Sequence, residues 1–318
     1  MKLPRVIFID GLPGSGKSTT AQRLSLHLRR HGHPARWVFE HETPHPIFEQ
    51  SAVRACREQQ PDADPELFSK ALDRYQSLAG QMNEGSAETI ILEGSLFQAA
   101  VGTQLLLEHP LATIETFFEA TLTALTPHAP ALIHLRPKDP AAALSQTALK
   151  RGTWFPEFVV AHLAATPLGQ KEQVTNWAQA LSILTRHRNT CDQLFDRFTG
   201  PRLAVDPQSE DWDAINLQIT QFLGLPPLRE PASDPRWARH VGRYRAEDSG
   251  DVWEFALTDH GLELVGPPAA RLWARPEGGF EIEGLAVEIE FESDGEAPSS
   301  GVRCSPRLAQ LPLHWHRV

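Results

Sequence analysis

The chain has 318 residues, of which 41% are hydrophobic, so it is long enough for two domains with sizeable cores. Its formal net charge of −10 argues against a broad nucleic-acid-binding surface, and no apolar run approaches the roughly 18–20 residues of a membrane span. Cys56, Cys191 and Cys304 lie far apart, which argues against a zinc site or a disulfide framework. A strand pattern begins within a few residues of Met1, so we expect no signal peptide and a cytoplasmic protein.

The first predicted element is a buried strand, Val6–Asp10, which leads into a glycine-rich turn. Gly11 through Ser18 fit the spacing Gly-x-x-x-x-Gly-Lys-Ser. In such a turn the glycines let several N–H groups face one anion, the lysine reaches the β- and γ-phosphates, and the serine coordinates Mg²⁺. We therefore expect ATP phosphates to be bound by Gly11, Gly14, Ser15, Gly16, Lys17, Ser18 and Thr19.

Strand and helix patterns then alternate up to about residue 224. After the first strand, further strands are predicted at Arg36–Glu40, Thr89–Glu93, Ala131–Leu135 and Arg202–Asp206. Helices are predicted at Thr19–Arg30, Pro65–Met82, Phe97–Leu107, Ile114–Leu125, Pro140–Lys150, Glu172–Phe198 and Asp211–Leu223. This alternation indicates an α/β domain over residues 1–224, with a parallel sheet covered on both faces and ligands at the carboxyl ends of its strands.

Acidic residues stand at the carboxyl ends of several predicted strands. Asp10, Glu40 and Glu93 each end a strand, and Asp206 follows Val205 directly. The pattern indicates a polar rim on the edge of the sheet where a ligand would lie, without assigning roles.

The pattern changes after Leu223. Residues 225–238 are proline-rich and have no period, so we expect a linker there. Residues 239–318 contain short alternating stretches, among them VWEFAL, GLELVG, GFEIEG and AVEIEFE, separated by turns. Alternation with a period of two predicts a small antiparallel β-domain, which bears a weak resemblance to lipocalin-like appendages.

The segment FIDGLPGSGKSTTAQRL resembles the opening of nucleotide-kinase-like P-loop phosphotransferases, thymidylate kinase and deoxynucleoside kinases among them. The resemblance is specific over residues 5–30, is diffuse to about residue 225, and does not extend into the C-terminal part. It implies a sheet of strand order 2-3-1-4-5, a direct transfer of a phosphoryl group, and the use of ATP and Mg²⁺.

The same resemblance gives roles to acidic residues after the second and third strands. Glu40 stands where deoxynucleoside-kinase-like enzymes place a carboxylate beside the acceptor hydroxyl, and Glu42 and His45 are candidates to line the acceptor pocket. Glu93 stands where such kinases hold Mg²⁺ or its waters, although it could instead cap the next helix. The residue after it is Gly94, where deoxynucleoside kinases carry arginine, so a direct arginine contact with the acceptor is missing at that position.

The resembling enzymes also close a lid over the transferred phosphoryl group. LKRGTWFPEF occupies the corresponding place, and Arg151 and Lys150 are the first candidates to bring positive charge, with Arg186 and Arg188 as second choices. The neighbouring aromatic residues could stack on a planar acceptor, but a core role is favoured. Asp10 is left open between a water-mediated Mg²⁺ contact and a hydrogen bond that shapes the loop.

These observations predict a kinase that moves the γ-phosphoryl group of ATP to a hydroxyl of a small molecule or nucleotide. Lys17, Glu40, Glu93 and Arg151 are the expected catalytic residues, and Ser18 and Glu93 the expected metal ligands. Two alternatives stay open: a non-enzymatic nucleotide-dependent switch whose β-domain recruits a partner, and a polynucleotide 5′-hydroxyl kinase, which the acidic composition disfavours. The β-domain could also form a homodimer.

Overall fold

The computed structural model describes residues 3–83, 87–209, 211–229, 233–266, 269–293, 297–307 and 312–318. It divides the chain into two compact units. The first consists of Met1–Ala21, His33–Glu40 and His45–Leu228, and the second of Gln22–Gly32, His41–Pro44 and Arg229–Val318.

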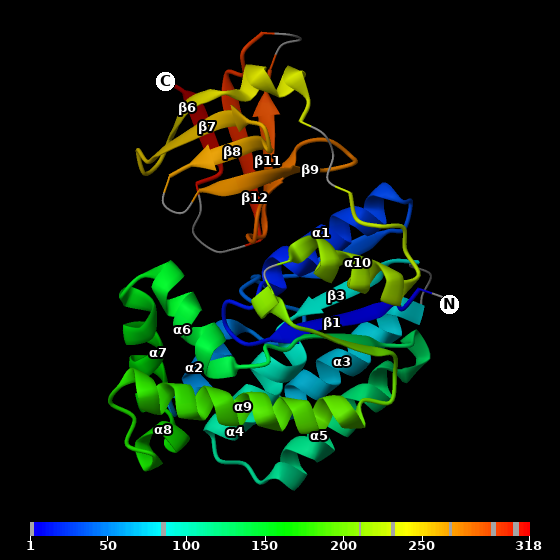
Figure 1. Cartoon of the computed structure of the whole chain (residues 1–318), viewed down its shortest axis with the longest axis vertical. Helices are drawn as coiled ribbons and strands as arrows, with labels where there is room; N and C mark the ends of the chain where they lie inside the picture. The colour runs from blue at the N-terminus through cyan, green and yellow to red at the C-terminus, as the bar shows by residue number, and fades with distance from the viewer. Residues whose placement is uncertain are drawn as a thin grey trace. The chain divides into compact units, whose positions relative to one another are not determined.

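A five-stranded parallel sheet forms the centre of the first unit (Figure 1). Its order is β2-β3-β1-β4-β5, which confirms the predicted sheet. The strands are β1 (Val6–Gly11), β2 (Ala35–Val38), β3 (Thr89–Glu93), β4 (Ala131–Leu135) and β5 (Arg202–Val205). Every residue of β1, β3 and β4 is buried, as expected for parallel strands covered on both faces.

The register brings the ends of the central strands to one edge of the sheet. Ile9 of β1 pairs with Glu93 of β3, and Gly11 pairs with Leu135 of β4. The glycine-rich turn that follows β1 therefore lies between the ends of its two neighbours. A ligand held by this turn is within reach of side chains that follow β3 and β4.

Helices cover both faces of this sheet. Figure 1 shows α1 and α10 on one face and α3, α5 and α9 on the other. The α-helices are α1 (Lys17–Arg30), α2 (Gln50–Arg57), α3 (Leu67–Asn83), α4 (Gly102–Leu106), α5 (Leu111–Leu125), α6 (Pro140–Arg151), α7 (Trp154–Ala164), α8 (Pro167–Lys171), α9 (Trp177–Arg197) and α10 (Trp212–Leu223). A π-helix, η1 (Ser95–Val101), follows β3, and short 3₁₀ turns occur at η2 (Thr126–His128) and η3 (Pro207–Ser209).

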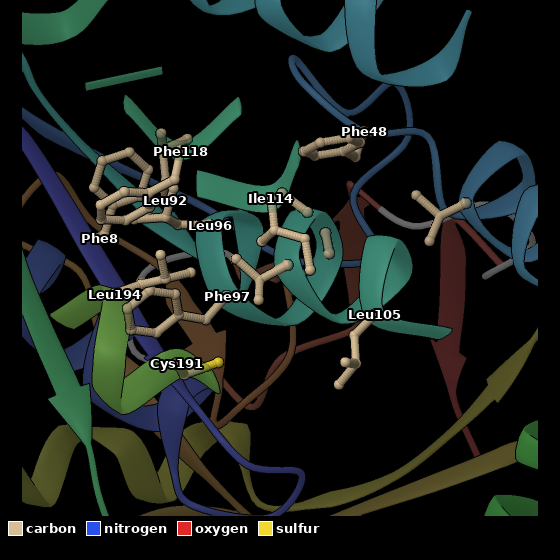
Figure 2. Packing of buried hydrophobic residues seen from close by; sticks show 14 of the residues in the cluster. Phe8, Phe48, Leu92, Leu96, Phe97, Leu105, Ile114, Phe118, Cys191 and Leu194 are labelled. Atoms are coloured by element: carbon tan, nitrogen blue, oxygen red, sulfur yellow. The ribbon is translucent and has the colours of Figure 1, made fainter. Parts of the chain in front are cut away.

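The largest buried cluster joins the sheet to the helices on one side of it. Figure 2 shows side chains from β1, β3, η1, α5 and α9 meeting there. Phe97 of η1 stacks on Phe118 of α5, with 6.3 Å between the ring centroids. This packing fixes η1, and with it the backbone directly after Glu93.

Several elements differ from the sequence prediction. β2 ends at Val38, so Glu40 lies two residues beyond the strand that it was expected to end. α9 begins at Trp177 and not at Glu172, because the Asn176 side chain accepts a hydrogen bond from the backbone N–H of Gln179 and caps the helix. The predicted helix Phe97–Leu107 begins earlier, at Ser95, and its first part is a π-helix.

The second unit contains a closed antiparallel barrel of eight strands. They are β6 (Gly242–Ala246), β7 (Val252–Thr258), β8 (Gly261–Val265), β9 (Ala270–Ala274), β10 (Phe280–Ile282), β11 (Val287–Glu292), β12 (Gly301–Pro306) and β13 (His314–Arg317). Each strand pairs with its neighbour in the chain, and β13 returns to β6. The antiparallel β-domain is thus confirmed, and it leaves no open sheet edge.

Buried aromatic side chains pack with aliphatic ones in the barrel core. Tyr244, Phe255 and Phe291 meet edge to face, and Trp253 stacks on Trp315 at 4.1 Å. A barrel of eight strands is just wide enough for such side chains to fill it.

A 3₁₀ helix, η4 (Pro235–His240), precedes the first barrel strand, so the end of the predicted linker 225–238 is helical; residues 230–232 of that linker lie outside the described residues. Among the helices that the structure describes, none has the length and apolar character needed to cross a bilayer.

Candidate active site

The glycine-rich turn lies between β1 and α1. Gly14 and Gly16 have φ values of 76° and 90°, in the left-handed region that glycine adopts readily. A Cβ on Gly14 would lie 2.3 Å from Cγ2 of Thr147, and one on Gly16 would lie 2.4 Å from Cη2 of Trp212. Both positions therefore require glycine for conformational and for steric reasons.

Lys17 lies inside this turn as the first residue of α1. Its side chain is buried, and Nζ donates a hydrogen bond of 3.2 Å to the backbone O of Leu12. The N–H of Ser15 also donates to that oxygen, at 3.1 Å. The ammonium group is thus held where the turn curls around it. Lysine is a compact point charge with three donors, well suited to phosphate oxygens.

Ser18 and Glu93 meet at the end of the turn. Oγ of Ser18 donates to Oε1 of Glu93 at 2.5 Å, and Glu93 is fully buried. The other carboxylate oxygen, Oε2, is buried and has no hydrogen-bond partner among the described residues. Burial, followed by the charge of Glu40, raises the pKa of Glu93 to about 8, and Lys17 opposes this shift.

This pair fits a divalent cation. Mg²⁺ prefers hard oxygen ligands, keeps several waters, and is bound by one or two carboxylates together with substrate phosphates. The unpartnered Oε2 of Glu93 beside a serine hydroxyl meets that requirement. No group of three or more His, Cys, Asp or Glu side chains able to hold a metal occurs in the described part of the chain.

Asp10, at the end of β1, accepts hydrogen bonds from the π-helix η1. Its two carboxylate oxygens take the backbone N–H groups of Leu96 at 3.2 Å and of Gln98 at 3.1 Å. Burial raises the pKa of Asp10 to about 7, while these bonds and Lys17 lower it. Asp10 therefore fixes the backbone after β3, whereas the hydrogen bond that the sequence left open was one that shapes the glycine-rich loop.

Glu40 lies against the segment that follows β3. Its Oε2 accepts a hydrogen bond of 2.5 Å from Nε2 of Gln98, and it would lie 3.0 Å from a Cβ built on Gly94. Gly94 has a φ of 61°, so it adopts a left-handed conformation beside Glu40. Glu40 and Lys17 both act electrostatically on Glu93, so the three side chains lie near one another.

The two acceptor-pocket candidates after Glu40 are buried and bonded. In the second unit, Glu42 accepts a hydrogen bond of 2.8 Å from Nη1 of Arg307. His45 uses Nδ1 to accept the backbone N–H groups of Ile47 at 3.1 Å and of Phe48 at 2.9 Å. His45 thereby fixes the backbone just before α2. The predicted role of both side chains toward an acceptor stays a prediction.

The lid candidates differ in their surroundings. Arg151 is exposed at the end of α6, and its guanidinium lies over the Phe155 ring at 4.9 Å. Arg186 is exposed on α9 and lies 3.6 Å from Glu172. Arg188 is mostly buried and its Nε is 2.9 Å from Asp192, so this arginine is held in place.

A pocket lies beside the glycine-rich turn and is lined by Leu12, Pro13, Gly14 and Ser15. The rest of its wall comes from α6 and from the segment after β5: Pro137, Ala143, Leu144, Gln146, Thr147, Lys150, Pro207, Gln208 and Trp212. Lys150, a lid candidate, is thus at a wall of this pocket.

Sequence reasoning missed Trp212, Gln98 and Arg57. Trp212 is far along the chain from Gly16, which it contacts, and no motif joins the two. Arg57 of α2 donates to the Gln98 backbone O at 2.7 Å and to Thr103 Oγ1 at 2.8 Å. Only Gln98 had a signal in the sequence: it lies in the first turn of the helix predicted shortly after Glu93.

No protein-family model matches the chain, and no curated protein matches its sequence. Among solved structures, the chain is similar to a thymidylate kinase from Candida albicans, at 15% sequence identity and a TM-score of 0.40. The match covers 70% of this chain and 94% of that one. A likeness of this degree says nothing of activity, and the fold assignment comes from the order and direction of the strands. The first unit has the P-loop kinase-type fold.

Proposed function

We propose that the protein is an ATP-dependent kinase that transfers the γ-phosphoryl group to a hydroxyl group of an acceptor. The observation that carries the proposal is the meeting of Lys17, Ser18 and Glu93 at the end of the glycine-rich turn. A fully buried carboxylate with one unpartnered oxygen costs free energy unless a ligand satisfies it. A cation bound with a nucleotide would remove that cost.

The nucleotide would lie along the turn with its phosphates on the backbone N–H groups around Lys17. The adjoining pocket, lined by α6 and by the segment that contains Pro207 and Trp212, would take the base. The indole of Trp212 offers an aromatic surface for stacking. The N-terminal end of α1 adds the positive end of a helix dipole toward the phosphates.

Ser18 and Glu93 would hold Mg²⁺, which when bound supplies charge neutralisation for the phosphate oxygens. The remaining steps use the chain's own residues. Lys17 stabilises negative charge on the transferred group, and Glu40 accepts the proton of the attacking hydroxyl. Arg151 and Lys150, at the end of α6, would bring further positive charge when the lid closes.

Lys17→Ala tests this proposal. Because it removes the lysine charge from the phosphate site, we expect loss of acceptor-stimulated ADP release by at least roughly 10²-fold, with an unchanged far-UV circular dichroism spectrum. Lys70→Ala, at an exposed lysine on α3, is the matched control and should keep full activity. The proposal fails if the purified protein binds ATP with Mg²⁺ but no acceptor raises ADP release above background.

A further inference from the structure

Three acidic residues, Asp10, Glu40 and Glu93, lie close together beyond the glycine-rich turn. The charges of Glu40 and Asp10 both act on Glu93 and raise its pKa. Lys17 is the cation that opposes this charge from within the glycine-rich turn, where the nucleotide phosphates would occupy it. The neighbourhood of Glu40 is therefore unfavourable for a second anion.

Gly94 limits what can be placed there. Its left-handed φ of 61° disfavours any residue with a Cβ, and that Cβ would lie 3.0 Å from Oε2 of Glu40. A basic residue at this position could bind an anionic acceptor, and glycine provides no such side chain. The residue after Glu93 therefore contributes no positive charge to the site.

Arg57 is a further cation near Glu40. Burial lowers the pKa of its guanidinium to about 10, and the negative charge of Glu40 opposes this shift. Arg57 is fixed by structural bonds, since Nη2 donates to the backbone O of Gln98 and Nε donates to Oγ1 of Thr103. It compensates the charge of Glu40 and anchors η1, and these bonds hold it away from the role of an anion receptor.

Gln98 provides a second acceptor of hydrogen bonds next to Glu40. Its Nε2 donates to Glu40 and its backbone N–H to Asp10, so the side chain is fixed at both ends. Its carbonyl oxygen, Oε1, is buried and has no partner among the described residues. A carboxylate and an amide oxygen held side by side call for a ligand with neighbouring hydrogen-bond donors.

We propose that the acceptor is a neutral or cationic compound with neighbouring hydroxyl or amino groups, such as a nucleoside, sugar or aminocyclitol, and not a phosphate monoester. Glu40 binds the hydroxyl that reacts, and the Oε1 of Gln98 binds a donor next to it. This inference rests on the proposed kinase function. It adds the substrate class and assigns Gln98 as a binding residue.

The chemical step is balanced without a further reactant. The acceptor oxygen forms a bond to the γ-phosphorus of ATP while the bond from that phosphorus to the β,γ-bridging oxygen breaks, and ADP leaves with the bonding electron pair. The hydroxyl proton passes to Glu40. A phosphate monoester carries roughly two negative charges, which would lie close to the Glu40 carboxylate. Like charges repel each other, so a monoester should bind there more weakly than the unphosphorylated compound.

A panel of matched acceptors tests the substrate class. ADP release with ATP and Mg²⁺ would be measured for thymidine, adenosine and glucose, and for the corresponding monophosphate of each. Kanamycin would be included as a cationic aminocyclitol. We expect turnover of at least one unphosphorylated compound. The kcat/KM of its monophosphate should be lower by at least roughly 10²-fold. If a monoester reacts as well or better, the substrate class is wrong and the kinase proposal stands. If none reacts while ATP binds, both proposals fail.

Gln98→Leu tests the binding residue with the reactive compound from that panel. It removes both polar groups of the amide, so we expect the acceptor KM to rise at least roughly tenfold while the ATP KM changes less than twofold. Gln81→Leu, on the exposed face of α3, is the matched control and should change neither value. An unchanged acceptor KM in a folded Gln98→Leu protein overturns the assignment of Gln98.

Discussion

Gly94 and Gly32 share a left-handed backbone but differ in what surrounds them. Their φ values are 61° and 76°, and a Cβ on Gly32 would meet nothing within 4 Å. A Cβ on Gly94 would press on Glu40. Comparing alanine substitutions at the two glycines therefore separates the free-energy cost of the left-handed backbone from the cost of the contact with Glu40.

We expect Gly32→Ala to lower the free energy of unfolding by about 1 kcal/mol, the cost of a left-handed alanine. Gly94→Ala should cost at least as much and should also lower kcat at least roughly tenfold, because Glu40 must move. Urea unfolding and acceptor-dependent ADP release measure the two effects. Equal activity of the two variants would show that the position of Glu40 does not matter for turnover.

Glu40 itself can be tested by removing its charge without changing its shape. Glu40→Gln should lower kcat by roughly 10²–10⁴-fold if Glu40 accepts the hydroxyl proton. ATP affinity, measured by calorimetry with Mg²⁺, should stay within about twofold because the proposed nucleotide site is the glycine-rich turn. Glu66→Gln, at an exposed site before α3, serves as the control. A fully active Glu40→Gln protein removes Glu40 from the mechanism.

At the scale of residues, the sequence was enough to predict a phosphate loop, because Gly11 through Ser18 are contiguous and match a motif whose positions have defined chemical uses. It could not reveal Gln98 or Trp212, since their partners come from other segments and no spacing relates them. Glu42 and His45 were singled out as polar residues in a loop. Their buried hydrogen bonds to Arg307 and to backbone N–H groups depend on the fold and leave no signal in the sequence.

Among the elements, the π-helix η1 has the most direct effect on the site. It begins two residues after Glu93, and side chains from elsewhere in the first unit bind its backbone groups. Asp10 accepts two of its N–H groups, Arg57 donates to the Gln98 carbonyl and His187 bonds to that of Phe97. π-Helical turns are rare and occur mostly at functional sites, and this one is held by three separate elements.

Arg57 and Arg54 of α2 test how much such anchoring contributes. Arg57→Met leaves the Gln98 carbonyl and Thr103 hydroxyl without their charged donor, so we expect a loss of about 2–3 kcal/mol in the free energy of unfolding. Arg54 is exposed and pairs with Glu58 one turn away, so Arg54→Met should cost less than about 0.5 kcal/mol. Urea unfolding compares the two. An equal, small effect would mean that η1 does not depend on Arg57.

The strands were predictable because buried parallel strands are short continuous apolar runs, as in Val6–Asp10 and Ala131–Leu135. The π-helix was predicted as an ordinary helix, since an apolar run of this length carries no mark of an extra residue per turn. Glu40 was assigned to a strand end because β2 is followed by Phe39, which continues the apolar pattern beyond the last paired residue, Val38.

For the whole molecule, composition and pattern were enough to separate an α/β unit from a later antiparallel one. Closure of the β-domain into a barrel was not predicted, because it depends on the pairing of β13 with β6, the last strand with the first. Pairings so distant in the chain cannot be inferred from alternation, which only defines one face of each strand. The same limit applies to the site, whose parts are spread from Asp10 to Trp212.

Two buried histidines make the stability of the whole molecule depend on pH. Burial lowers the pKa of His187 to about 4 and that of His134 to about 3, so both are neutral in the folded protein. An unfolded histidine titrates near 6.5, so the unfolded state binds more protons below that pH. Each histidine therefore lowers the free energy of unfolding as the pH falls from about 6.5 toward its folded pKa. The raised pKa values of Asp10 and Glu93 act in the opposite direction, lowering stability as the pH rises toward 7–8.

These opposing effects overlap when the free energy of unfolding of the wild type is plotted against pH. The contribution of His187 is therefore best obtained as the difference between His187→Gln and wild type. Gln can keep the donor to the Phe97 carbonyl, which His187 now contacts at 2.9 Å, and it does not titrate. Relative to wild type, His187→Gln should gain about 1.4 kcal/mol in free energy of unfolding for each pH unit between 6.5 and 4. Urea unfolding at pH 7, 6, 5 and 4.5 measures this gain, and His33→Gln at an exposed site controls for the exchange itself. Parallel profiles for His187→Gln and wild type would show that His187 is not held neutral by the fold.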